Sequence, residues 1–197
     1  MQNALILFVR NPELGKVKTR LAATIGNQKT LLIYNILLKH TRTITEGLEA
    51  TAFVFYNDAI HPNDIWNGYN KVTQHGNTLG EKMENAFAYT FAKGYTNVAI
   101  IGSDCYDLTT AILTNAFTQL QTNNVVIGPA NDGGYYLLGM QQLYPTLLAN
   151  KAWSTPTVYN ATIANCKALQ LTIHTLPTLV DIDDITDLEQ TRLIELV

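Results

Sequence analysis

The chain has 197 residues, of which 47% are hydrophobic and 15% are charged, and its formal net charge is −3. This composition argues against intrinsic disorder, because disordered chains combine low hydrophobicity with high net charge. The acidic balance also argues against a protein that coats nucleic acid, since such proteins need a surplus of lysine and arginine. The length suits a single domain, which we expect to span residues 1–197.

Predicted strands and helices alternate along the chain. The apolar run 4–9 ends at Asn11-Pro12 and is typical of a strand that is buried on both faces. Helical spacing of apolar residues follows at 30–48. The remaining pattern predicts strands at 51–56 and 69–74, a helix at 80–93, a strand at 98–102, a helix at 109–120, strands at 125–129 and 135–140, a helix at 157–168, a strand at 171–176 and a helix at 186–196.

This alternation predicts an α/β fold with a mostly parallel central sheet and helices on both faces. Strand 135–140 follows a turn too short for a crossover, so we expect it to run antiparallel. Cys105 and Cys166 lie far apart and predict neither a disulfide framework nor a zinc site. The sequence has no long apolar run and no signal-peptide pattern, so we expect no membrane span and a soluble, cytoplasmic protein.

The few cations are concentrated directly after the first predicted strand. In open α/β sheets the ligand crevice lies beyond the carboxyl ends of the strands. The segment is not a Walker A loop, because Arg10 and Val17 stand where that motif needs glycine and serine or threonine. We interpret it as a loop that binds the diphosphate of a nucleotide, the alternative being a solvated basic turn. The residues assigned to nucleotide binding there are Arg10, Gly15, Lys16, Lys18 and Arg20.

Carboxylates follow two other predicted strands. Asp104 comes after strand 98–102, and a magnesium ion needs only one or two carboxylates beside phosphate oxygens. We assign Asp104 to a metal ion and Asp107 to capping of the next helix, capping being the alternative for Asp104 too. Asp181 and Asp183 alternate, so in an extended segment both point to one face. Asp184 is expected to cap the last helix.

The segment 131–134, Asn-Asp-Gly-Gly, has two readings that the sequence leaves open. It is a tight hairpin turn, or a place where a ligand approaches backbone N–H groups. Of Tyr135 and Tyr136, which alternate in a strand, one is expected in the core. Trp153 either lines a pocket or anchors a loop, and we favour the anchor. No G-x-S-x-G motif or histidine spacing supports a hydrolase or a histidine metal site.

Several motifs together resemble one bacterial family. They are Phe8-Val-Arg-Asn-Pro-Glu-Leu-Gly-Lys-Val-Lys-Thr-Arg-Leu21, Leu79-Gly-Glu-Lys-Met83, Gly102-Ser-Asp-Cys105, Asp107-Leu-Thr109, Gly128-Pro-Ala130, Asp132-Gly-Gly-Tyr-Tyr136, Asp181-Ile-Asp183 and Asp187-Leu188. In this order, across nearly the whole chain, they resemble the DUF2064 family. Its members are glycosyltransferase-like proteins similar to the 2-phospho-L-lactate guanylyltransferase CofC.

The resemblance implies a GT-A-like nucleotide-diphospho-sugar transferase fold, with a nucleotide at the first loop and a divalent metal at Asp104. Carried over, Lys16, Lys18 and Arg20 contact phosphates, whereas Asp132, Gly133 and Gly134 face the acceptor or sugar side. Tyr106 departs from the Asp-Cys-Pro-Asp pattern of the family, so the bend after Asp104 can differ.

These observations predict a metal-dependent transferase with a nucleotide-sugar or nucleoside triphosphate donor and a small-molecule acceptor. The catalytic candidates are Asp104, Asp132 and Arg20, and Asp132 is the base if the acceptor is a hydroxyl. Mg²⁺ or Mn²⁺ is expected at Asp104, with Asp181 and Asp183 completing its shell. Nucleotidyl and glycosyl transfer both stay open, and the alternative is a sugar-nucleotide-binding module without catalysis.

Overall fold

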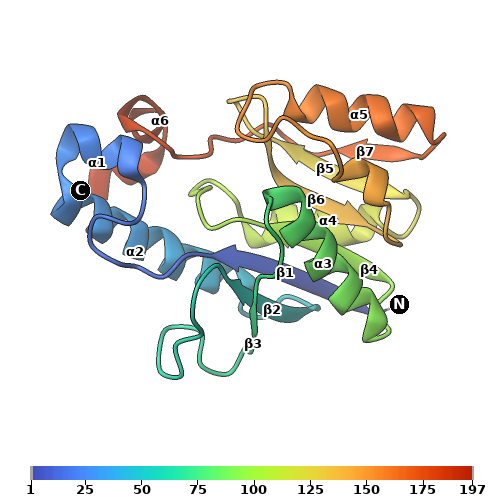
Figure 1. Ribbon diagram of the computed structural model, residues 1–197, viewed down its shortest axis with the longest axis horizontal. Helices are drawn as coiled ribbons and strands as arrows, with labels where there is room; N and C mark the ends of the chain where they lie inside the picture. Colours follow the sequence, from blue (N-terminus) through green and yellow to red (C-terminus); the bar gives the residue numbers. More distant parts are fainter. Residues whose placement is uncertain (1, 197) are drawn as a thin grey trace.

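The computed structural model describes residues 2–196, and within this range seven strands form one sheet in the order β3-β2-β1-β4-β6-β5-β7 (Figure 1). Strand β6 runs antiparallel to both neighbours, β4 and β5, and the other pairings are parallel. This confirms the predicted direction of strand 135–140. The strands are β1 Asn3–Val9, β2 Thr51–Tyr56, β3 Asn70–Thr73, β4 Asn97–Ile101, β5 Val125–Pro129, β6 Tyr135–Met140 and β7 Ile173–Thr175.

Helices cover both faces of the sheet, as the alternating pattern predicts. One core lies between the sheet and α2 and α4, and a second core lies between the opposite face and α3 and α5. The helices are α1 Thr19–Ile25, α2 Asn27–Thr45, α3 Leu79–Ala92, α4 Thr110–Gln119, α5 Val158–Ala168 and α6 Ile185–Glu189, with short 3₁₀ turns η1 Pro145–Leu147 and η2 Arg192–Leu196.

Strand β1 shows why a continuous apolar run is needed at the centre of such a sheet. Leu5 and Leu7 are fully buried in the core under α2 and α4. Ala4 and Ile6 are fully buried in the core under α3. Each side chain that alternates along the strand therefore meets a helix layer, and neither face is available to water.

The chain differs from the prediction at three places. Helix α1 is missing from the sequence interpretation, and Gly26, with φ 83°, separates it from α2, which begins earlier than predicted. The predicted helix 186–196 is broken into α6 and η2, where the Thr191 hydroxyl donates to the carbonyl of Leu188 and competes with the helical bonds. Helices α1 and α6 lie side by side beyond the carboxyl end of β1 (Figure 1).

The prediction that Asp107 caps α4 is wrong. The helix begins at Thr110, and the Thr109 hydroxyl accepts the N–H of Ile112 as its N-cap. Asp107 lies two residues further back and pairs with Arg192, with 3.3 Å between Oδ1 and Nε. The capping prediction for Asp184 is confirmed, because Asp184 and Asp187 form a reciprocal capping box at α6.

No helix among residues 2–196 combines the length and hydropathy that crossing a membrane requires.

Candidate functional site

A cleft of about 630 Å³ opens at the carboxyl ends of β1 and β4. This volume lies within the range of small-molecule sites, about 300–1,000 Å³. Its walls come from the segment after β1, the segment after β4, the beginning of α3, the β5–β6 turn and residues 153–155. It is therefore at the sheet edge where ligands of open α/β proteins bind.

Tyr34 of α2 fixes the floor of the cleft. Its hydroxyl accepts the backbone N–H of Arg10 at 3.0 Å and donates to the carbonyl of Arg10 at 3.1 Å. Ser103, after β4, donates to the same oxygen at 3.5 Å. Burial and the nearby charge of Asp104 raise the pKa of Tyr34 to about 12, so the phenol stays protonated. The helix thus holds the ends of β1 and β4 in fixed positions.

Lys18 and Asp104 form the ion pair at the centre of the cleft. Lys18 Nζ lies 2.6 Å from Asp104 Oδ2, and the lysine side chain is only 7% exposed. Burial alone lowers the pKa of Lys18, but the carboxylates of Asp104, Asp181 and Asp183 outweigh it and raise the pKa above its usual value. Lys18 is therefore a buried, charged ammonium among carboxylates.

The backbone of Lys18 is unusual as well. Lys18 stands at the N-cap of α1 with φ 47° and ψ 51°, the left-handed region that side-chain-bearing residues seldom adopt. This conformation costs about 1–2 kcal/mol. Such strain is typical of functional sites, where the surrounding contacts hold a residue in place. Here the contact is the ion pair with Asp104.

The C-terminal segment brings the second pair of predicted metal ligands to the same place. It runs parallel to the end of β5 through a bridge between Ala130 and Leu179, and the N–H of Ile182 donates to the carbonyl of Asp104 at 3.0 Å. Ile182 is fully buried, whereas Asp181 and Asp183 on either side of it line the cleft. Both carboxylates share one face, as the alternation predicts.

These carboxylates repel one another. Burial raises the pKa of Asp181 to about 7, and the charges of Asp104, Asp132 and Asp183 add to the shift while Lys18 opposes it. Asp183 is paired instead with Arg20, with 2.7 Å between Oδ2 and Nη1 in an exposed setting. The cleft therefore joins clustered negative charge to the cations of the first loop.

A divalent metal suits this donor set chemically, because Mg²⁺ and Mn²⁺ favour carboxylate oxygens. Within residues 2–196, however, no three acidic, histidine or cysteine side chains are grouped so as to hold a metal ion. Lys18 and Arg20 pair with two of the three predicted ligands, Asp104 and Asp183. The Lys18 ammonium therefore competes with a metal ion for Asp104 Oδ2.

The hairpin reading of the segment 131–134 is confirmed, whereas the approach of a ligand to its backbone N–H groups stays a prediction. It is the tight connection between β5 and β6, closed by a hydrogen bond from the N–H of Ala130 to the carbonyl of Gly134 at 3.0 Å. Asp132 and Gly134 also line the cleft, and Asp132 Oδ1 accepts the N–H of Gly134 at 2.8 Å. Of the two tyrosines that follow, Tyr136 is buried in the core, as expected for one of them.

Most of the residues predicted for the site meet in the cleft, but three do not. Arg10, Lys18 and Arg20 line it, as do the aspartates discussed above. Gly15 and Lys16 are not among its lining residues; Lys16 is 74% exposed and pairs with Glu13 at 2.6 Å. Gly133 is also absent from the lining and packs against Pro156 instead.

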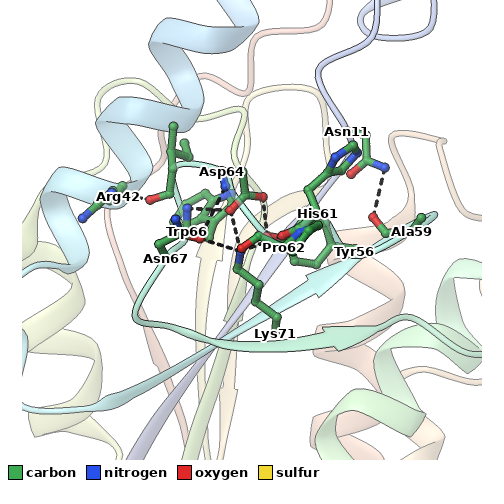
Figure 2. A network of polar contacts seen from close by, with 11 residues as sticks. Asn11, Arg42, Tyr56, Ala59, His61, Pro62, Asp64, Trp66, Asn67 and Lys71 are labelled. Carbon is green, nitrogen blue, oxygen red and sulfur yellow. Dashed lines mark hydrogen bonds and ion pairs between the residues drawn. The ribbon is translucent and has the colours of Figure 1, made fainter.

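A network of polar contacts holds the loop between β2 and β3 together (Figure 2). The ammonium of Lys71, in β3, donates three hydrogen bonds within this loop. They go to the carbonyl of His61 at 2.7 Å, to Asp64 Oδ1 at 2.8 Å and to Asn67 Oδ1 at 3.0 Å. The side chain of Asn11 donates to the carbonyl of Ala59 at 3.1 Å and ties this loop to the first one. The loop therefore positions its first residue, Asn57, which lines the cleft.

The sequence interpretation missed several lining residues. Tyr34 has the spacing of an ordinary core residue in a helix, and no signal distinguishes it. Lys82 donates to Asn57 Oδ1 at 2.8 Å. It lies within the motif 79–83, which is the sequence feature that could have indicated it as a site residue. Trp153, which the sequence predicts as a loop anchor, lines the cleft and also packs against Gly80.

Known proteins resemble this chain in sequence and in fold. The model of a family described as an uncharacterized protein conserved in bacteria (DUF2064) matches residues 43–155. No curated protein matches the sequence. A crystal structure from Desulfovibrio desulfuricans G20, provisionally named a nucleotide-diphospho-sugar transferase, has a TM-score of 0.90 and 31% identity, covering 95% of this chain and 85% of that one.

More distant structures share the fold alone. A CMP:2-keto-3-deoxy-manno-octonic acid synthetase complexed with CTP has a TM-score of 0.63 and 8% identity, covering 100% of this chain and 99% of that one. Rv0371c from Mycobacterium tuberculosis H37Rv, complexed with manganese, has a TM-score of 0.60 and 13% identity, with 100% of both chains covered. The chain therefore has the α/β fold of nucleotide-diphospho-sugar transferases, as predicted.

Proposed function

Because the chain belongs to the DUF2064 family, and its cleft joins cations to clustered carboxylates, we propose that it is a transferase with a nucleotide-sugar or nucleoside triphosphate donor. The observation that carries the proposal is the buried ammonium of Lys18, 2.6 Å from Asp104 and surrounded by Asp181 and Asp183. The diphosphate of a nucleotide would balance the charge of the cations, and a divalent metal bound with it would balance the charge of the carboxylates.

The residues of the first loop bind the diphosphate in this proposal. Lys18 acts as a point charge on phosphate oxygens, and the planar guanidinium of Arg20 contacts two oxygens at once. Arg10 lines the same side of the cleft. Lys16, Gly15 and Gly133 stay predicted contributors, and they would have to act from outside the cleft lining.

Asp104, Asp181 and Asp183 would hold Mg²⁺ or Mn²⁺ once Lys18 and Arg20 have turned to the phosphates. The metal, when bound, neutralises charge that develops on the diphosphate leaving group. The protein's own contribution is positioning and electrostatic stabilisation: the Tyr34 contacts fix the loop, and Lys18 and Arg20 stabilise the leaving group. Asp132 takes the proton of a hydroxyl acceptor.

The released product distinguishes the two reactions. The protein is incubated with Mn²⁺ and either nucleoside triphosphates or nucleotide sugars, together with a panel of acceptors. Release of pyrophosphate identifies nucleotidyl transfer, and release of a nucleoside diphosphate identifies glycosyl transfer. Nucleotide binding without either product supports the non-catalytic binding module, and the absence of any nucleotide-dependent thermal stabilisation contradicts the proposed donor site.

A further inference from the structure

One wall of the cleft carries no cation. We call it the acceptor wall, and it consists of the β5–β6 turn, the first residue of β6 and the segment 153–155. The cations that line the cleft, Arg10, Lys18, Arg20 and Lys82, all come from the segment after β1 or from α3. The residues of the acceptor wall are Asp132, Gly134, Tyr135, Trp153, Ser154 and Thr155.

At two glycines, the absence of a side chain leaves room for residues of this wall and the proline next to it. A side chain at Gly80 would lie 2.9 Å from the indole nitrogen of Trp153, and one at Gly133, which has φ +85°, would lie 2.3 Å from the carbonyl oxygen of Pro156. The rings of Tyr135 and Trp153 meet edge to face, with 6.4 Å between centroids.

Among the residues of the acceptor wall, Asp132 is the one whose side chain is an acid of the carboxylate type. The side chain is exposed, and its charge is close enough to contribute to the raised pKa of Asp181. A phosphomonoester carries about two negative charges near neutral pH and binds where arginine, lysine or clustered N–H groups face it. Asp132 would repel such a group, and no cation of the wall would offset the repulsion.

We propose that the acceptor wall binds an uncharged, hydroxyl-bearing ring, such as a sugar or cyclic polyol, and discriminates against its phosphorylated counterpart. The inference rests on the proposed function, whose acceptor it specifies. Aromatic rings set edge to face offer apolar surface to the C–H face of such a ring, and the Ser154 hydroxyl and the Asp132 carboxylate supply polar partners.

The transfer step balances with a hydroxyl acceptor. The acceptor oxygen forms a bond to the donor atom that is joined to the diphosphate, and the bond from that atom to the diphosphate oxygen breaks. The electron pair leaves with the diphosphate, and the hydroxyl proton passes to Asp132. Because Oδ1 accepts the Gly134 N–H, Oδ2 is the oxygen that takes the proton, and exposure lets it return the proton to water.

The test compares probes that differ by one phosphate. Glucose and glucose 6-phosphate, and myo-inositol and its 1-phosphate, are titrated into the full chain with Mn²⁺ and a saturating nucleoside diphosphate. Trp153 fluorescence reports binding, since the other tryptophan, Trp66, is only 2% exposed in the core. We expect the uncharged member of at least one pair to bind ten-fold or more tightly than its phosphate.

Two variants locate the effect. Asp132→Asn should reduce the discrimination to less than three-fold, because the repelling charge is removed. Trp153→Phe should abolish the fluorescence change, and calorimetry on the same variant should show an unchanged affinity for the nucleoside diphosphate. A preference for the phosphorylated probe, or binding of neither probe while the nucleotide binds, overturns the inference. Failure of the nucleotide itself to bind counts against the proposed function instead.

Discussion

Replacing Lys18 by methionine tests the electrostatics of the cleft most sharply. Methionine keeps the unbranched apolar part of the side chain but removes the buried ammonium, so Asp104, Asp181 and Asp183 lose their shared counter-charge. Breaking a buried ion pair costs about 3–5 kcal/mol, and water reaches the 33% exposed side chain of Asp104, so we expect a loss of about 2–3 kcal/mol in the free energy of unfolding.

Urea denaturation measures this loss, and the melting temperature should fall by about 4–12 °C for a domain of this size. Lys16→Met is the matched control. Its lysine lies on the same loop but is 74% exposed, so its replacement should leave the free energy of unfolding unchanged within the error of the measurement.

Manganese should act differently on Lys18→Met and on the wild type. Without the competing ammonium, Asp104 is free to bind Mn²⁺, so Mn²⁺ alone should stabilise Lys18→Met more than the wild type. Mn²⁺ at 100 times its dissociation constant for the variant should raise the variant's free energy of unfolding by about 2.7 kcal/mol. A variant as stable as the wild type, or one that Mn²⁺ stabilises no more than the wild type, would refute the reasoning.

Two other changes test the framework of the cleft. Asp64→Asn should lose about 1–2 kcal/mol of stability at pH 7. Burial opposes the low pKa of Asp64, but hydrogen bonds from Lys71 and Tyr56 outweigh it, so this contribution is present above about pH 4 and disappears as the pH falls below that value. Denaturation curves at pH 7 and pH 3 check it, and an equal deficit at both would contradict it. Gly133→Ala should lose about 1–3 kcal/mol in a thermal melt because its new methyl group would meet Pro156, whereas Gly102→Ala, with no atom within 4 Å of the added carbon, should melt near the wild type.

Much of the fold follows from the sequence because the central strands are buried on both faces. Runs such as 51–56, 125–129 and 135–140 have the same bounds in the structure as in the prediction. Helix α1 is not predictable in this way, because its seven residues form less than two full turns and bury only Leu21. It forms where the strained backbone of Lys18 is held by a contact that is distant in sequence.

The candidate site, like the fold, is predictable from the sequence only in part. The cationic loop, Asp104 and the alternating pair Asp181 and Asp183 are visible because chemistry-bearing residues follow predicted strands. The pairing of Lys18 with Asp104, rather than of Asp104 with other carboxylates, depends on how α1 and β4 lie in space. Sequence spacing also could not separate Lys18, which is buried, from Lys16, which is exposed two residues earlier.

The central claim is that Asp104 links a divalent metal to a nucleotide diphosphate in this cleft. Calorimetric titration of a nucleoside diphosphate, with and without Mn²⁺, tests it on the wild type and on Asp104→Asn. We expect Mn²⁺ to raise the affinity of the wild type for the nucleoside diphosphate at least ten-fold and to leave that of Asp104→Asn unchanged. An equal dependence on Mn²⁺ in both proteins would contradict it.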